Sequence, residues 1–580
     1  MMQNFNLIDL LDSENLPLKN RVGQEGGYYA PRKDPFARGA EVLSPDLKPK
    51  ETFHTQSLIP TEPLQEGEQY RFHFDMTLCI GCNCCVVACN EQNNNPADVN
   101  WRRVGEIEGG IYPGTKKYHL SVACNHCLDP SCLTGCPTDA YIKLENGVVK
   151  HQEEECIGCG YCTWNCPYGV PQYNAERHIV TKCDMCHSRL KEGQMPACVA
   201  ACPESAIKIE KVNIQEWREN HLSADAPHMP DSGMTISTTR ITLPQEMPES
   251  MLRANRHRLE PEQPHTSLIF MTVLTQLAVG GFLALWCGDA LASWLSFLKP
   301  LKHFLPFGAS GMLVVTGLAL FAAIFHLGRP LHAYKALRMW RRSWLSREVL
   351  FFALFSKMGA VYAGLQLARC FWHWQIPEPL MFFLGGGVAC LGLAGIYASA
   401  RIYLVPARPA WNTPRTPLRF FLTGFILGPL FSLVVYAFYL MGQVPKYVNP
   451  YFEGPVISLA CICAIAGFSQ LVVLFWRLFN FWDQGSEELS GSSFLLVHRF
   501  KRYFLARMAF LVLGSIVTPF ALMYCVSLGN LSRVAFLVLV TLAFLAALLG
   551  EFLGRYLFFV TVVPKNMPGS FFSKNGSAHS

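Results

Sequence analysis

Sixteen cysteines lie in four ordered groups within one stretch of the chain, between residues 79 and 202. Each group begins with two cysteines separated by two residues, and three of the groups end in Cys-Pro. Two intervening residues let one tight loop present both sulfurs to the same centre, while the more distant cysteine ties two loops together. Thiolates gathered in this way favour soft metal centres. The groups are Cys79, Cys82, Cys85 and Cys89; Cys124, Cys127, Cys132 and Cys136; Cys156, Cys159, Cys162 and Cys166; and Cys183, Cys186, Cys198 and Cys202.

The spacing C-x2-C-x2-C-x3-C-P of the third group is the bacterial ferredoxin pattern, which holds iron–sulfur clusters. Zinc sites use C-x2-C pairs but rarely this full run, and a disulfide framework would not repeat one spacing four times. The third group is complete, so we expect four [4Fe–4S] clusters and no three-iron centre. We also expect assembly in a reducing compartment. Cys84 falls outside the spacing and is interpreted as a cysteine that binds no cluster.

The four groups read as two duplicated modules of short hairpins and helices. By analogy with the ferredoxin fold, we expect the groups to work in pairs: the first with the fourth (the outer groups) and the second with the third (the inner groups). Within a pair, the last cysteine of each group is expected to bind the cluster held by the other group. The expected ligand sets are Cys79, Cys82, Cys85 with Cys202; Cys183, Cys186, Cys198 with Cys89; Cys124, Cys127, Cys132 with Cys166; and Cys156, Cys159, Cys162 with Cys136.

The second half of the chain is strongly apolar. Of 580 residues 51% are hydrophobic and only 16% charged, and the mean hydropathy is +0.19. Runs long enough to cross a bilayer are expected at 267–288, 306–327, 349–369, 379–403, 417–441, 455–479, 504–527 and 534–560. The net charge of +6 is explained by arginines beside these spans, because no basic stripe or nucleic-acid motif is present.

Basic residues concentrate in the loops between spans two and three, four and five, and six and seven. The opposite loops offer little beyond Lys299, Lys302, Lys446 and Arg533. The arginine-rich side is also the side of the cysteine domain, so we expect that domain on the cytoplasmic face of a bacterial inner membrane. The first residues lack the pattern of a signal peptide and a twin-arginine pair.

Polar residues of the spans gather on the membrane face nearest the cysteines. His326 ends the second expected span and Glu348 begins the third. A histidine with a nearby carboxylate could bind a quinol hydroxyl and take its protons, so this pair is the candidate quinol site. Weaker candidates on the same face are Arg401, Tyr403, Glu551 and Arg555.

Structural interpretations stay open for these residues. Glu348 follows Ser346 at a helix start and could serve as a cap, and His326 could close a helix end. Arg401 and Arg555 could extend to the lipid headgroups. Lys357 has no assigned role but is expected to face the bundle. No pair of histidines lies within the spans, so no haem is expected.

The chain from about Tyr70 to Phe559 resembles two subunits of the dimethyl sulfoxide reductase family. The cysteine half is similar to its four-cluster electron-transfer subunit, through Cys124-Asn125-His126-Cys127, Cys156-Ile157-Gly158-Cys159, Cys166-Pro167-Tyr168-Gly169 and Lys182-Cys183-Asp184. The apolar half is similar to its eight-span anchor, through His326-Leu327-Gly328, Pro330-Leu331, Leu345-Ser346-Arg347-Glu348, Arg401-Ile402-Tyr403, Phe420-Phe421-Leu422-Thr423 and Glu551-Phe552-Leu553-Gly554-Arg555.

The resemblance implies a menaquinol or ubiquinol site at His326 and Glu348, no haem, and a separate catalytic subunit with a molybdenum or tungsten pterin centre. In that family the two halves are usually separate chains, and relatives that respire dimethyl sulfoxide carry their clusters outside the cytoplasm. Sulfite-oxidising relatives keep them inside. The terminal substrate and the direction of electron flow therefore stay open.

We expect an electron-transfer and membrane-anchor subunit that works in anaerobic respiration of an S-oxide, N-oxide or sulfur oxyanion. Quinol chemistry would occur in the membrane half and the terminal reaction in the partner. The alternatives are a sulfite-oxidising complex and a ferredoxin–quinone module without a molybdenum partner. The expected fold is an α+β ferredoxin-like domain fused to an all-α eight-helix bundle. The expected parts are 1–70 (extended arm), 71–215 (cluster domain), 216–264 (linker or surface strap), 265–563 (anchor) and 564–580 (tail).

Overall fold

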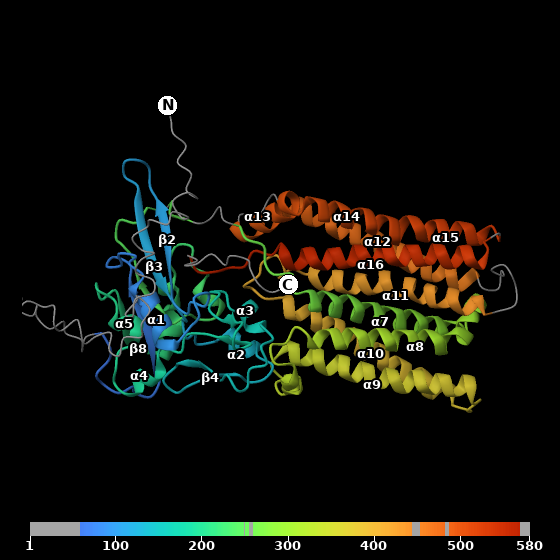
Figure 1. The fold of residues 1–580 in the computed structure, drawn as a ribbon, viewed down its shortest axis with the longest axis horizontal. Helices are drawn as coiled ribbons and strands as arrows, with labels where there is room; N and C mark the ends of the chain where they lie inside the picture. The colour runs from blue at the N-terminus through green and yellow to red at the C-terminus, as the bar shows by residue number, and fades with distance from the viewer. Residues whose placement is uncertain are drawn as a thin grey trace, which may run out of the picture. The chain divides into compact units, whose positions relative to one another are not determined.

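The computed structural model describes residues 58–248, 250–254, 259–442, 453–481, 486–529 and 531–568. Most of the expected N-terminal arm, the end of the tail and Lys446 lie outside the described residues. The described residues form a small α+β domain of short strands and helices, followed by an all-helical region (Figure 1). The expected fold class is confirmed.

A three-stranded sheet brings the two ends of the cysteine stretch together. Strand β1 (Glu68–Asp75) pairs antiparallel with β8 (Ile207–Asn213) and parallel with β9 (Arg240–Thr242). Phe72 and Phe74 are buried on one face of β1 and Gln69 and Arg71 on the other, so both faces of this strand are covered. Because β1 leads into the first cysteine loop and β8 follows Cys202, this sheet sets the distance between them.

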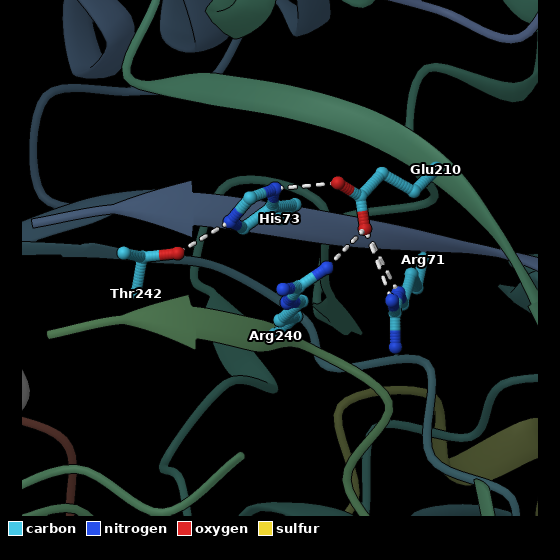
Figure 2. Close-up of polar contacts among 5 residues, drawn as sticks. All are labelled: Arg71, His73, Glu210, Arg240 and Thr242. Carbon is cyan, nitrogen blue, oxygen red and sulfur yellow. Dashed lines mark hydrogen bonds and ion pairs between the residues drawn. The ribbon is translucent and has the colours of Figure 1, made fainter. Parts of the chain in front are cut away.

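A polar cluster ties the three strands together (Figure 2). Glu210 on β8 accepts hydrogen bonds from the Arg71 guanidinium at 3.0 and 3.2 Å and contacts Nδ1 of His73 at 2.5 Å. The other ring nitrogen of His73 lies 2.8 Å from Thr242 Oγ1 on β9. Burial alone would raise the pKa of Glu210, but the contacts with His73 and Arg71 hold this pKa at about 2.

The rest of the cysteine domain consists of short elements. Strands β2 (Arg103–Gly109) and β3 (Lys116–Val122) form a hairpin with β10 (Leu252–Arg253) at its edge, and β4 (Tyr141–Lys143) with β5 (Val149–His151) and β6 (Gln172–Asn174) with β7 (Ile179–Thr181) form two smaller hairpins. The helices are α1 (Cys84–Asn93), α2 (Ser131–Gly135), α3 (Tyr161–Asn165), α4 (His187–Lys191) and α5 (Ala197–Ala200).

The segment expected as a linker or strap contributes to the cysteine domain. It begins within helix α6 (Ile214–Asn220) and supplies strands β9 and β10. Its Thr238 donates a hydrogen bond to the Asn125 carbonyl at 2.6 Å, and Thr235 contacts Cys127 Sγ at 3.1 Å. Much of this segment is therefore held against the second cysteine group.

Eight helical segments of the described residues are long and apolar enough to cross a membrane. They are α7 (Thr266–Leu291), α8 (Pro300–Ile324), α9 (Trp344–Phe371), α10 (Glu378–Tyr403), α11 (Arg415–Met441), α12 (Glu453–Phe481), the combined segment α14 (Lys501–Val512) to α15 (Thr518–Ser527), and α16 (Arg533–Val560). A π-helical turn, Leu513–Val517, joins α14 to α15, and a short helix α13 (Glu487–Phe494) precedes them.

The long helices run side by side (Figure 1), with α7 and α11 the most buried of them. Glycines allow these two to approach closely: a Cβ on Gly280 would lie 2.1 Å from the Gly424 carbonyl oxygen, and one on Gly428 would lie 2.1 Å from Gly281 N. Gly280 and Gly281 therefore allow close packing of these two helices.

Three details differ from the sequence-based expectations. Helix α8 ends at Ile324, so His326 lies in the turn after the span. Helix α9 begins at Trp344, so Ser346 and Glu348 lie within its first two turns, and the residue before the helix is Ser343. Lys357 is exposed on the outer face of α9, whereas we expected it to face the bundle.

Candidate functional site

Two cavities in the cysteine domain are walled by thiols. The first has an empty volume of about 330 Å³ and is lined by Cys79, Cys82, Cys85 and Cys202. The second, of about 350 Å³, is lined by Cys124, Cys127, Cys132 and Cys166. In each cavity three thiols come from one group and the fourth from a distant group. The structure thus brings together the members of two of the four expected sets.

The thiols of the other two expected sets are also neighbours. Burial raises the pKa of the Cys89 thiol, and the nearby Cys198 and Cys186 raise it further. Burial likewise raises the pKa of Cys162, with Cys159, Cys156 and Cys136 adding to the shift. All sixteen cysteines are free of disulfides. Thiols that resist deprotonation on their own need a bound cation to become thiolates.

The spacing of these thiols is wider than a single ion requires. Among the described residues, no three His, Cys, Asp or Glu side chains gather closely enough to hold one metal ion. Around a four-iron cluster each thiolate binds a different iron, so its sulfurs stand farther apart than the four ligands of one zinc ion. The donor set and the cavities therefore fit a cluster.

Backbone amides point at the sulfurs. Gly158 N donates to Cys156 Sγ at 3.4 Å, Met185 N to Cys183 Sγ at 3.4 Å, and Ala206 N to Cys202 Sγ at 3.3 Å. The loops reach this shape through left-handed residues, with Gly158 at φ 70° and Met185 at φ 61°. Such bonds to sulfur orient the ligands and stabilise negative charge on a cluster.

The third cysteine group packs directly on the loop that follows α8. Arg329 N donates to the Ile157 carbonyl at 3.1 Å, and Gly328 N to the Gly158 carbonyl at 3.4 Å. A Cβ on Gly158 would lie 2.9 Å from Gly328 Cα, and one on Gly328 would lie 2.1 Å from the His178 carbonyl oxygen. Only glycine at these two positions permits the approach.

Helix α3, between Cys159 and Cys166, inserts two aromatic side chains into the core of the helical region. Tyr161 is 4% exposed and Trp164 6% exposed, and both belong to the same apolar core as the membrane helices. The Trp164 ring lies 5.4 Å from Trp411 and 5.7 Å from Tyr403, measured between centroids. The third cysteine group is therefore packed directly against the membrane half.

The candidate quinol residues lie along this contact. Glu348 on α9 is 3% exposed, and its Oε1 has no hydrogen-bonding partner among the described residues. It is close enough to Tyr161 and to Tyr403 for its charge to act on both hydroxyls. His326 lies two residues before Gly328, with Nδ1 2.5 Å from the Ala323 carbonyl oxygen. Burial lowers the pKa of His326 to about 4.

Three of the weaker candidates lie beside this contact. Arg401 and Tyr403 end α10; the Arg401 guanidinium stacks 4.9 Å over the Trp344 ring. The Arg555 guanidinium on α16 lies 3.8 Å over the Phe420 ring and donates to Gln276 Oε1 at 2.7 Å.

Glu551, one turn from Arg555, is already engaged by the bundle. Its two carboxylate oxygens accept from Thr423 Oγ1 at 2.5 Å and from Gln470 Nε2 at 2.9 Å. Of these two buried glutamates, only Glu348 keeps a carboxylate oxygen available to a ligand.

The alternative interpretation of Glu348 as a helix cap receives no support from the two serines near the start of α9. Ser343, before the helix, donates to the Gly135 carbonyl at 2.6 Å, and Ser346 to the Pro137 carbonyl at 3.4 Å. Neither serine caps the first turn of α9. Both hydroxyls instead bind the second cysteine group.

The basic loop between α8 and α9 is largely engaged with the cysteine domain. Arg329 donates to the Glu153 carbonyl at 2.8 Å, Lys335 pairs with Glu155 at 3.1 Å, and Arg342 pairs with Asp139 at 2.9 Å. Arg338 also pairs with Glu155. These charged side chains therefore make contacts within the protein. From the sequence, they had served only to predict which side of the membrane the loop faces.

Sequence reasoning also missed His265, which precedes α7. Its ring lies 5.3 Å from Trp164, and its charge would act on His326. Burial lowers the pKa of His265. Tyr161 and Trp164 were likewise overlooked. Two aromatic residues in a short loop between cluster-type cysteines could have indicated a packing contact with an apolar part of the chain.

The thiol-lined cavities and the long apolar helices define a class of protein: an iron–sulfur electron-transfer domain joined in one chain to a multi-pass membrane anchor. Residues 115–212 match the 4Fe-4S dicluster domain, and residues 261–560, more than half of the chain, match the DMSO reductase anchor subunit. This protein belongs to the DMSO reductase anchor subunit (DmsC) family, extended by an iron–sulfur domain. The first cysteine group lies outside the dicluster match.

The cysteine half is similar to several curated relatives. It is 43% identical over 169 residues to the probable anaerobic dimethyl sulfoxide reductase chain YnfG of Escherichia coli, covering 27% of this chain and 82% of the relative. It is 41% identical over 172 residues to an anaerobic dimethyl sulfoxide reductase chain of Haemophilus influenzae, covering 28% and 84%. It is 32% identical over 207 residues to a sulfite dehydrogenase subunit of Allochromatium vinosum, covering 32% and 80%.

Proposed function

We propose that this chain passes electrons between membrane quinol and a separate catalytic subunit through four [4Fe–4S] clusters. The observation that carries the proposal is the packing of the third cysteine group against the membrane half. Its Gly158 touches Gly328, two residues after His326, and its Tyr161 is buried beside Glu348. Electrons leaving a quinol at this place have a cluster as their nearest acceptor.

The sixteen cysteines are the proposed ligands, in the four sets expected from the sequence. When bound, each cluster accepts and releases one electron at a time. The chain contributes the thiolates, the amide–sulfur hydrogen bonds and the burial that separates the centres from water. Support comes from the two thiol-lined cavities and from the neighbouring thiols of the other two sets.

His326 and Glu348 are the proposed proton acceptors. Because His326 Nδ1 donates to the Ala323 carbonyl, Nε2 carries the free lone pair. The low pKa keeps the ring neutral at physiological pH, so it can accept a proton from one quinol hydroxyl. The unpartnered oxygen of Glu348 can accept a hydrogen bond from the other. Oxidation of one quinol releases two electrons and two protons and leaves the quinone.

The catalytic partner is proposed to dock where the first cysteine group reaches the surface. Cys82 is exposed there, and Leu78, Ile80 and Val87 expose 40%, 59% and 57% of their surface. Exposed apolar side chains around a cluster-type loop suit a protein partner. The family relationship favours a molybdenum or tungsten pterin subunit that reduces an S-oxide, N-oxide or sulfur oxyanion. Sulfite oxidation with the reverse electron flow is the second candidate, favoured by the similarity to a sulfite dehydrogenase subunit.

A third candidate is a ferredoxin–quinone module without molybdenum. Purifying the tagged protein from native membranes separates it from the other two. Near-stoichiometric molybdenum or tungsten and a co-purifying large subunit are expected. Sixteen irons per chain with neither metal nor a large partner would favour the ferredoxin module. An oxidised sample dominated by a stoichiometric three-iron EPR signal would contradict four [4Fe–4S] clusters.

The quinol site is tested by Glu348→Gln and His326→Arg. Removing a positioned proton acceptor lowers such rates about 100-fold or more, so quinol-driven cluster reduction should nearly stop while iron content and reduction by dithionite persist. Glu378→Gln is the matched control, since Glu378 begins α10 at its other end and pairs with Arg369 at 2.8 Å. Unchanged quinol oxidation in both variants would contradict the proposed site.

We propose the cytoplasmic face of the inner membrane for the cysteine domain. Arg329, Lys335, Arg338 and Arg342 bind that domain, so the argument rests on other basic residues on the same side. These are the half-exposed Arg347 and the exposed Arg341, Arg499, Lys501 and Arg502. A protease added outside intact spheroplasts should leave the domain uncut, and cleavage there would reverse the assignment.

A further inference from the structure

Arg102 is a buried cation in the cysteine domain. It directly precedes β2 and is 2% exposed. Its Nη1 donates to the carbonyl oxygen and to the hydroxyl of Ser121 at 3.4 and 3.2 Å. Its guanidinium carbon lies 4.8 Å over the Phe72 ring. A guanidinium stays charged at all physiological pH values, so this position holds a permanent positive charge.

Two of its nitrogens are orphaned. Nε and Nη2 are buried and have no hydrogen-bonding partner among the described residues. Leaving donors of a buried charged group unpaired is costly, so an acceptor is expected there when the protein is complete. Lys182, another buried cation of the domain, differs: its Nζ donates to the carbonyls of Val149 and Cys183 and contacts Cys124 Sγ at 3.6 Å, in one of the inner sets.

The surroundings of Arg102 identify the acceptor. Four thiols are close enough to act on its charge, namely Cys198, Cys85, Cys183 and Cys89. Cys85 belongs to the proposed set that includes Cys79, and the other three belong to the set completed by Cys89. The guanidinium therefore lies between the two outer sets, and Ser121, which holds it, is itself 3.4 Å from Cys85 Sγ.

We propose that Arg102 raises the reduction potentials of both outer clusters by donating to their sulfurs and by stabilising the negative charge gained on reduction. The inference rests on the proposed ligand sets. A cluster becomes more negative by one charge when it accepts an electron, and a fixed cation in a dry interior favours that state. One residue that lies between two centres shifts both of their potentials in the same direction.

The test is a redox titration, followed by EPR, of the full-length protein in membranes. The signals of the outer pair are first assigned from their loss in C85S and C198S variants. Arg102→Gln should move the midpoints of both outer clusters to more negative potential and leave the inner two unchanged. Arg102→Lys should shift them less, because it keeps the charge and loses the fork of donors. Arg218→Gln, which removes an exposed arginine paired with Asp129 at 3.1 Å, should shift none.

Full iron content with four unchanged midpoints in Arg102→Gln would overturn the inference. If that variant does not load iron, the Arg102→Lys titration decides: a downward shift confined to the outer pair supports the role, and no shift in any cluster overturns it. Failure of the proposed function looks different, because the unmodified protein itself would then lack four clusters by iron analysis and EPR.

Discussion

At the third cysteine group, Tyr161 and Trp164 are buried in the core of the membrane helices, and Gly158 touches Gly328. At the first group, Cys82 and the side chain of Ile80 are exposed. The two groups share one type of loop and the same cysteine spacing, yet one packs against the membrane half of its own chain and the other is exposed on the surface.

This contrast shows how two copies of one module can take different places in an electron-transfer chain. Both loops have the spacing that holds a cluster, so their proposed roles as the quinol end and the partner end must come from the residues between and around the cysteines. Aromatic residues follow Cys159, whereas isoleucine and asparagine accompany Cys79 and Cys82. The following substitutions test this contrast at each end.

Gly328→Val should have the largest effect, at the membrane end. A side chain there would collide with the His178 carbonyl oxygen and the Tyr173 hydroxyl, forcing the cysteine loop away from the bundle. A displacement of about 1 Å can cost about 100-fold in rate, so quinol-driven cluster reduction should fall by that order while dithionite reduction is unchanged. Gly317→Val is the control, because a Cβ at Gly317 on α8 meets nothing within 4 Å. Equal rates in both variants would show that the contact does not matter.

Glu210→Gln should weaken the sheet that closes the first cysteine set. A pKa held at about 2, against an ordinary 4.5, corresponds to up to about 3 kcal/mol, and partial exposure reduces the expected loss to about 2 kcal/mol. Because the pKa is depressed in the folded state, this stability is present above pH 4.5 and is lost as the pH falls toward 2.

Thermal unfolding of the detergent-solubilised protein, followed by cluster absorption, measures this effect. The difference between Glu210→Gln and the unmodified protein should be full at about pH 7 and roughly half of that at about pH 3.5. Glu106→Gln is the control: Glu106 pairs with Lys117 at 2.8 Å on the surface, and such a pair contributes less than about 1 kcal/mol. A pH-independent difference for Glu210→Gln would contradict the assigned pKa.

Ile80→Asp should have the smallest effect, at the partner end. Replacing an exposed apolar contact with a charge at the docking surface should weaken binding of the catalytic subunit about tenfold, equivalent to about 1.4 kcal/mol. Co-purification at increasing dilution measures this. Leu222→Asp is the control, since Leu222 is an apolar residue 63% exposed elsewhere on the domain, and it should leave the complex intact. If both variants lose the partner equally, docking at the first group is wrong.

Much of this architecture could be predicted from the sequence. Cysteine spacing predicted which thiols of one group would be neighbours, because a two-residue gap fixes local loop geometry regardless of the surroundings. The pairing of distant groups was predicted by analogy with the ferredoxin fold. Hydropathy predicted the eight spans to within a few residues at most ends. The shift at α8, which begins at Pro300 rather than near residue 306, reflects a proline that is well tolerated in the first turn of a helix.

The contacts between the two halves could not be predicted. The partners of Arg329 and Arg342 are 176 and 203 residues away in the chain. Nothing in a loop of arginines distinguishes a residue that binds the cysteine domain from one that faces solvent. His265 was missed for the same reason, since a lone histidine before a span has no local signature. The orientation of Lys357 was wrong because a charge in the middle of an apolar run favours the bundle only when a polar partner lies there.

The joining of the two halves in one chain changes what their contact must achieve. Two separate subunits have to meet and stay bound at cellular concentrations, whereas a covalent connection keeps each surface at an effective concentration in the millimolar range for short flexible connections. The glycine contact between Gly158 and Gly328 is too small to provide affinity, but it can fix the alignment of the two surfaces. In a fused chain this alignment is enough, so the interface is free to be selected for the rate of electron transfer, and its binding strength becomes secondary.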